Sequence, residues 1–269
     1  SPESGRGHKL LETAGLAAKV AERSSEVGEH YITRTRSEYR TMLGQAAGGG
    51  AITAFTTWMK FGVAALGLSA FWSGWWAGVG YAASFVLIQL LHFTLATKQP
   101  AMTAPAMAAK LKDLSEPQAL SNFADEVTHL VRSQVAAVLG NVGLVFPLVI
   151  LLSLALQFGR GQPMLSTDEA TYVLRSLTLL GPTALFAALT GVLLFACSII
   201  AGWSENWFVL QRLDSALRYN PKITRTLGAV RADRWASFMR THISGFSANI
   251  SLGLMLGLAR KMDTELAGR

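Results

Sequence analysis

Apolar stretches long enough to cross a membrane constrain this chain more than any other feature of its sequence. Four of them cover residues 51–71, 75–96, 135–158 and 177–203. The hydrocarbon core of a bilayer is about 30 Å thick, and a helix needs roughly 20 apolar residues to cross it. Because backbone polar groups in lipid must be satisfied within the segment, we expect helices there and not strands. A fifth stretch, residues 243–259, is shorter and rich in glycine, and whether it crosses is left open.

The composition agrees with this interpretation. Hydrophobic residues make up 51% of the 269 residues and charged residues only 15%, against about 25% charged in an average soluble domain. This balance argues against a disordered chain and against an ordinary soluble enzyme. The predicted fold class is all-α: a polytopic membrane protein with 4–5 transmembrane helices plus amphipathic cytosolic helices. The single cysteine, Cys197, excludes an intramolecular disulfide and a multi-cysteine metal site.

Lysine and arginine residues are distributed unevenly between the apolar stretches. The successive polar segments carry 7, 0, 4, 2 and 7 of them, beginning with the N-terminal segment. Cytoplasmic loops of membrane proteins are enriched in these residues. We therefore expect a cytoplasmic N-terminus, with the segments before the third and fifth stretches on the same side. The net charge of +7 needs no further explanation, such as nucleic acid binding.

The same boundaries divide the chain into six predicted segments. In order, they are a cytosolic helical segment (1–47), a transmembrane hairpin (48–97), a cytosolic loop with a helix (98–133), a second transmembrane hairpin (134–203), a cytosolic helical segment (204–242), and a short glycine-rich membrane segment with a tail (243–269).

Polar side chains inside the apolar stretches are the candidate binding residues, because an ionisable group at bilayer depth is costly and usually faces protein or water. The strongest candidate is Lys60, which falls near the middle of its stretch and continues a polar stripe that includes Thr56. Two interpretations stay open: Lys60 lines a cavity at the bilayer midplane, or its long side chain reaches the headgroups. The remaining candidates are His92, Asn141, Glu205, Asn206 and Asn249.

Several candidates have a simpler structural interpretation. We expect Asn141 and Asn249 to bridge helices through their amides, and His92 to be interfacial or hydrogen-bonded. Glycines spaced four apart, at 74 and 78 and at 253 and 257, indicate helix contacts. The triplet of glycines at 48–50 is expected to be a hinge, although its N–H groups would also suit a phosphate.

No motif for catalysis or for cofactor binding occurs in the sequence. It contains no phosphate-binding loop, dinucleotide fingerprint, zinc-protease motif or nucleophile elbow. Its five histidines are scattered and not paired at metal-ligand spacing. We expect no cofactor and no metal, and we do not expect an enzyme.

Long strings of the sequence resemble one bacterial integral-membrane family, catalogued as "site-specific recombinase" (Gcr-like). They are HYITRTRSEYRTMLGQAAGGGAITAFTTWMKF (30–61), QLLHFTLATKQPAMTAPAMAAKL (89–111), SLTLLGPTALFAALTGVLLF (176–195), IAGWSENWFVLQRLDSAL (200–217) and ISGFSANISLGLMLGL (243–258). The resemblance implies a bacterial inner-membrane location and a chain that is a portion of a longer protein. The activity in the family's name has to be supported by the residues present.

A tyrosine recombinase needs Arg and His side chains and a Tyr nucleophile in one site. The matching residues are an arginine among Arg34, Arg36 and Arg40, then His129 with Arg132, then Tyr172. If residues 135–158 span the membrane, Tyr172 lies on the opposite side from His129 and Arg132. The sequence therefore does not support recombinase chemistry.

Three functions remain. The favoured one is a non-catalytic inner-membrane protein that organises or accompanies a membrane complex. The first alternative is a transporter or lipid-handling protein with a polar midplane cavity, and the second is a protein associated with DNA recombination. The expected partners are membrane lipids and other proteins, or the remainder of a longer chain; nucleic acid is not expected.

Overall fold

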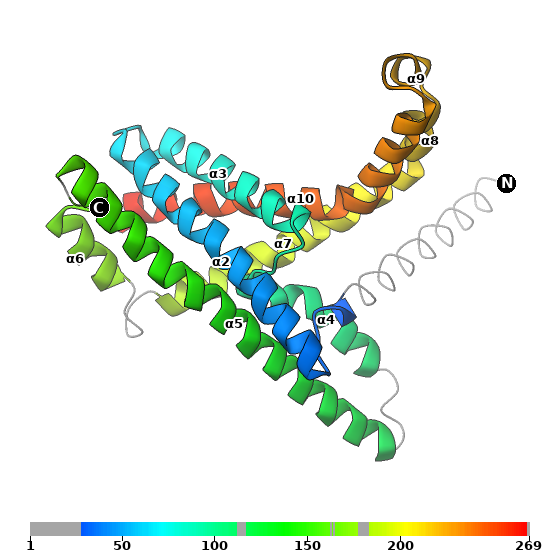
Figure 1. Ribbon diagram of the computed structural model, residues 1–269, viewed down its shortest axis with the longest axis horizontal. Helices are drawn as coiled ribbons and strands as arrows, with labels where there is room; N and C mark the ends of the chain where they lie inside the picture. Colours follow the sequence, from blue (N-terminus) through cyan, green and yellow to red (C-terminus); the bar gives the residue numbers. More distant parts are fainter. Residues whose placement is uncertain (1–27, 112–116, 162, 164, 177–182, 268–269) are drawn as a thin grey trace.

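The fold consists of helices throughout the part of the chain that the structure describes (Figure 1). This computed structural model describes residues 28–111, 117–161, 163, 165–176 and 183–267. The predicted all-α class is confirmed for these residues. Much of the predicted segment 1–47 lies outside them.

Ten helical elements follow one another along the described chain. They are α2 (Arg36–Ala65), α3 (Ala70–Leu90), the short 3₁₀ helix η1 (Ala96–Lys98), α4 (Gln99–Lys110), α5 (Pro117–Arg160), α6 (Thr167–Ser176), α7 (Thr183–Leu210), α8 (Leu213–Tyr219), α9 (Pro221–Leu227) and α10 (Ala229–Ala267). Four of the long helices continue across the predicted segment boundaries: α2, α5, α7 and α10. In each of them, an apolar stretch and the polar segment next to it form a single helix.

The ends of α2 follow from its sequence. Thr35 and Glu38 form a capping box, in which each side chain accepts from the backbone N–H of the other residue. At the other end, Gly67 adopts a φ of 62°. Glycine adopts this left-handed conformation readily, and the chain turns there into α3.

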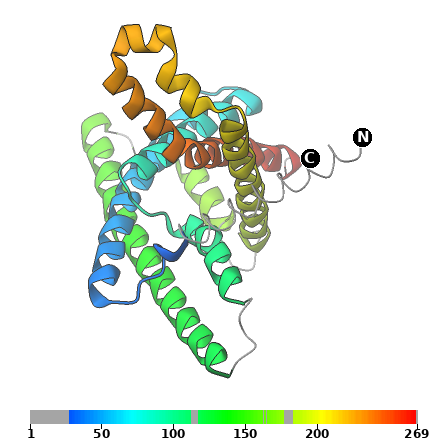
Figure 2. The ribbon, with the colours of Figure 1, turned by 90° about the vertical axis from the view of Figure 1, so that its right-hand side faces the viewer.

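Two helix pairs make up most of the structure, α2 with α5 and α3 with α10 (Figures 1 and 2). The first pair runs in the same direction, because Thr33 lies beside Ser133 and Gly50 beside Asn141. The second pair is antiparallel, with Gln89 beside Gly245. Helix α7 packs on α10, and the segment between α3 and α4 connects the two pairs.

Small residues bring α3 and α10 into close contact. Gly78 lies against the backbone of Leu254 and Gly257, and Gly253 lies against Ala82. Gly257 also meets the carbonyl of Gly74. The predicted role of these spaced glycines in helix contacts is confirmed, because a side chain at these positions would hold the backbones apart.

The glycine triplet 48–50 is not a hinge, and that prediction was wrong. The three residues lie within the uninterrupted helix α2. Their missing side chains make room for the Phe93 ring, the Thr94 carbonyl and the backbone of Asn141, respectively. The triplet therefore serves the close packing of α2 against α5 and against the connection after α3.

The number of candidate membrane spans is three in the described residues, so the expectation of 4–5 was wrong by this measure. By length and composition, the spans are Leu120–Arg160, Thr183–Leu210 and Ala229–Ala259. The stretch in α2 is weakened by Lys60 and its threonines, and the one in α3 by tryptophans, glycines and Tyr81. The uncertain fifth stretch belongs to the third span, because α10 continues through it.

The packing of α2 leads to a test with a matched control in the same helix. A methyl group at Gly50 would meet the Asn141 backbone, whereas one at Gly62 would meet nothing within 4 Å. We expect Gly50→Ala to lower the free energy of unfolding by about 1–3 kcal/mol. Gly62→Ala should raise it, by up to about 1 kcal/mol, because alanine favours a helix. Thermal unfolding of the full chain in detergent measures both, and equal effects would contradict the described packing.

Candidate functional site

The side chain of Asn141 holds the connection between α3 and η1 in place. Its Oδ1 accepts from the Ala96 N–H at 2.7 Å, and its Nδ2 donates to the Thr94 carbonyl at 3.0 Å. The same Nδ2 also donates to the Ala46 carbonyl of α2. Asn141 is 8% exposed. Its predicted role as a helix bridge is confirmed, and the amide is fully used by the backbone.

A second asparagine joins α10 to the same connection. Asn249, which is also 8% exposed, donates from Nδ2 to Gln89 Oε1 at 2.5 Å and accepts from Lys98 Nζ at its Oδ1. The Lys98 ammonium lies 4.0 Å from the centre of the Phe85 ring. We call Gln89, Lys98 and Asn249 the lysine cluster. The predicted bridging role of Asn249 is confirmed, but its partners include a cation.

Helix α7 supplies an apolar neighbour to the lysine cluster. Cys197 is buried, and its Sγ lies 3.9 Å from the sulfur of Met255. The sequence has no Asp or Glu from residue 39 to 112, none from 170 to 204 and none from 234 to 262. These ranges cover α3, η1 and the parts of α7 and α10 that pack near Lys98. No carboxylate in the described residues forms a salt bridge with it.

The lack of a carboxylate changes the protonation of Lys98. The residue is half-buried and belongs to η1, outside the three candidate spans. Burial of its ammonium lowers the pKa of Lys98 from its ordinary value of 10.5 to about 7. Near neutral pH, the charged and neutral forms of Lys98 are therefore both populated.

Lys110, another half-buried lysine, is paired with carboxylates, and so is the neighbouring Arg34. Lys110 contacts Glu29 at 3.2 Å and Glu126 at 3.0 Å, and Arg34 bridges the same two carboxylates. Burial would raise the pKa of Glu29, but hydrogen bonds from Arg34 and Lys110 outweigh it and hold that pKa below its ordinary value. Lys98 differs from these cations in having a neutral amide where they have carboxylates.

Lys60 and Thr56 lie apart from the lysine cluster, on α2. The Thr56 hydroxyl donates to the Ile52 carbonyl at 2.7 Å and shares a second hydrogen bond, also 2.7 Å long, with the Ser84 hydroxyl of α3. Lys60 is half-buried, and its ammonium lies 5.3 Å from the Phe61 ring centre on the same helix. Through Thr56, the polar stripe thus contributes a hydrogen bond between α2 and α3.

The remaining predicted residues are also dispersed. His92 is exposed and has a φ of 55° at the end of α3. Glu205 and Asn206 are half-buried in the last third of α7. The predicted residues therefore do not converge on one cavity, and only Asn249 belongs to the lysine cluster.

Sequence reasoning missed Lys98 and Gln89 as site residues. It counted Lys98 among the loop cations, because the residue follows an apolar stretch as an ordinary anchoring lysine would. The available signal was the long carboxylate-free stretch on both sides of it. The contact with Asn249, 151 positions later, could not be read from spacing.

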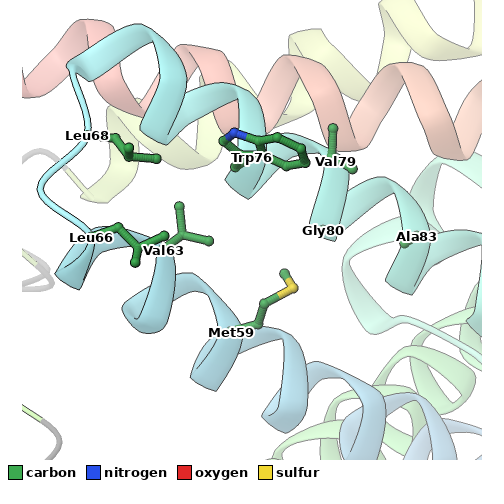
Figure 3. Close-up of a pocket in the computed structure, with 8 residues that line it drawn as sticks. All are labelled: Met59, Val63, Leu66, Leu68, Trp76, Val79, Gly80 and Ala83. Carbon is green, nitrogen blue, oxygen red and sulfur yellow. The ribbon is translucent and has the colours of Figure 1, made fainter.

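An apolar groove of about 550 Å³ lies between α2 and α3, near the turn that joins them (Figure 3). Its lining is Met59, Val63, Leu66, Leu68, Trp76, Val79, Gly80 and Ala83. Lys98 follows the opposite end of α3, so the groove and the lysine cluster are separate. With no ionisable side chain in its lining, the groove suits hydrocarbon and not acid–base chemistry.

The residues that would form a recombinase site are not brought together. Arg34 is held by Glu29 and Glu126, and Arg132 donates to the Thr33 carbonyl at 2.8 Å. Tyr172 belongs to α6, which follows the far end of α5 along the chain. That end lies about 40 Å along the helix from Arg132, at 1.5 Å per residue. Nor do the described residues contain a group of three His, Cys, Asp or Glu placed to hold a metal ion.

Comparison with known proteins gives one family. A family model described as site-specific recombinase matches residues 3–267, which is essentially the whole chain. No curated protein and no solved structure matches it.

The low pKa of Lys98 predicts how stability depends on pH. Between pH 7 and 10.5 the unfolded chain retains a proton that the native chain has released, so native stability rises with pH there. In this range, the free energy of unfolding of the wild type should rise by up to about 1.4 kcal/mol per pH unit because of Lys98. We expect Lys98→Met to remove this rise. Thermal unfolding from pH 6 to 9, in neutral detergent with chloride as the only anion, measures it. If stability depended on pH in the same way in the wild type and in Lys98→Met, the burial of this ammonium would be contradicted. The control is Lys222→Met, which removes an exposed lysine.

Proposed function

The chain belongs to the site-specific recombinase family, and we propose that it acts in the bacterial inner membrane as a non-catalytic protein that organises or accompanies a membrane complex. The observation that carries this proposal is a basic arm, formed by residues 211–240. The arm comprises α8, α9 and the first part of α10, and it projects from the rest of the molecule (Figures 1 and 2).

Ion pairs and buried alanines join the helices of the arm to one another. Arg240 of α10 contacts Asp214 of α8 at 2.9 Å, and Arg218 contacts Asp233 at 2.7 Å. Ala232 and Ala236 are fully buried along α10 on the inside of the arm. Its surface is therefore presented in one arrangement, which favours recognition over flexible tethering.

The charges left over on the arm point outward. Its two acids are both used in these ion pairs, whereas five of its seven bases are exposed and carry no described ion pair: Arg212, Lys222, Arg225, Arg231 and Arg234. Large apolar side chains lie among them, with Tyr219 73% exposed and Trp235 47% exposed. Arginine with exposed aromatic residues is typical of protein interfaces, so we infer an acidic partner protein with apolar contacts.

The membrane location is supported by the three candidate spans and by their surfaces. Phe146, Phe158, Val192 and Phe195 on α5 and α7 are each more than half exposed, and an apolar helix face of this kind requires lipid or a partner. The three candidate spans, in α5, α7 and α10, follow one another along the chain as successive crossings would. With the lysine and arginine pattern, this favours a cytoplasmic N-terminus and a cytoplasmic arm.

The two alternatives have weaker support. Transport through a polar midplane cavity lacks the convergence of Lys60, Thr56 and His92 that it would need. Recombination lacks a site that joins Arg132 to Tyr172, so the family name does not by itself assign chemistry to this chain.

Native mass spectrometry of the protein, extracted gently from the membranes of its own host, tests the proposal. We expect a stoichiometric additional protein subunit, reduced at least tenfold in the double variant Arg231→Gln, Arg234→Gln. The matched control is Arg36→Gln, Arg40→Gln, which removes two exposed arginines at the start of α2. A lone chain carrying lipid would favour lipid handling, and bound DNA would favour recombination. If both double variants reduced the additional subunit equally, the proposed role of the arm would be contradicted.

Cysteine labelling tests the orientation. In a Cys197→Ser background, we expect Ala229→Cys to react only from the cytoplasmic side. We expect Gly159→Cys to react only from the opposite side, since the candidate span α7 lies between the two positions in the chain. Position 159 is open and free of backbone strain, whereas Gly161 has a φ of 68°. Labelling of both positions from the same side would contradict the crossing of α7.

A further inference from the structure

The lysine cluster contains a cation that no carboxylate neutralises within the part of the chain that the structure describes. A charge removed from water has to be paired or lost, and Asn249 offers Lys98 only a neutral oxygen. We propose that the lysine cluster is a binding site for a single phosphate group, carried by a lipid headgroup or by a soluble anion. This site is independent of the basic arm.

The geometry of the cluster leaves capacity for a ligand. An ammonium has three N–H donors, and Asn249 accepts one of them. The Asn249 amide cannot turn away, because Gln89 holds its other end at 2.5 Å. Lys98 is therefore fixed in position with donors to spare, and a phosphate oxygen is a strong acceptor for them.

The direction of the Lys98 side chain is unusual for a lysine beside an apolar helix. Such side chains normally extend toward the headgroups. Here the ammonium lies over Phe85, which is about five residues back along α3 from Leu90, where that helix ends. The residue as a whole nevertheless keeps part of its surface exposed.

A purely structural role would call for a different residue at position 249. Aspartate has nearly the same shape as asparagine and would pair with Lys98 directly. Instead the chain places asparagine there and has no carboxylate in the nearby parts of α3, α7 and α10. The unpaired charge is thus available to a ligand.

Thermal shift of the full chain in neutral detergent tests the proposal. The probes are inorganic phosphate and short-chain phosphatidylglycerol, each compared with sodium chloride at equal ionic strength. We expect one probe to raise the melting temperature of the wild type, with at least a fivefold higher half-maximal concentration in Lys98→Gln. The control Lys222→Gln removes an exposed lysine of the arm and should respond as the wild type does.

A second variant keeps the test valid if Lys98→Gln folds poorly. Asn249→Asp supplies the missing carboxylate, and Gln89 donates to it after its amide turns over. We expect this variant to be at least as stable as the wild type and to lose its response to both probes.

Each result bears on the proposal. A response to phosphate alone identifies a soluble anion, and a response to phosphatidylglycerol alone identifies a lipid headgroup. No response of the wild type above the chloride control overturns the proposal. So does an unchanged response in Asn249→Asp. The variant Arg231→Gln, Arg234→Gln should keep the full response, so failure of the arm proposal would leave this result unaffected.

Discussion

The hydrogen bonds of Asn141 hold together the part of the structure on which the rest depends. The chain between α3 and η1 is not helical, and its buried N–H and C=O groups need partners. Asn141 satisfies the Ala96 N–H and the Thr94 carbonyl, while the Thr94 N–H donates to the Gln45 carbonyl of α2. The approach is close enough only because glycine occupies 48–50. Helices α2 and α5 and the exit from α3 are therefore one packed unit.

Two asparagines have comparable positions but different chemistry. Asn141 uses its amide entirely on backbone groups, which leaves nothing to bind or react. Asn249 uses its amide on the side chains of Gln89 and Lys98, one of them a cation. In the sequence, both residues stand out for the same reason, namely that each is a polar residue inside an apolar stretch. Only the identity of the partner separates a structural bridge from a binding site.

The sequence was sufficient for features that depend on local pattern. Glycine spacing indicated helix contacts at positions where α3 and α10 do meet, although not that these two helices are the partners. The apolar stretch after Arg132 indicated that Tyr172 lies far from it. The continuity of α2 and α10 was not predictable in this way, because hydropathy changes where a helix leaves an apolar environment and not where it ends. Lys98 was missed because its environment is made by α10, which arrives from a distant part of the chain.

Helix α10 carries both the outer surface of the arm and the inner partner of Lys98. Arg234 and Asn249 are separated by about 22 Å of continuous helix at 1.5 Å per residue. Gly253 and Gly257 fix the helix against α3 just beyond Asn249. The arm and the glycine contact with α3 therefore belong to one continuous helix. A movement of the arm would therefore be transmitted along α10 to Gly245 and Asn249, and so to Gln89 and Lys98.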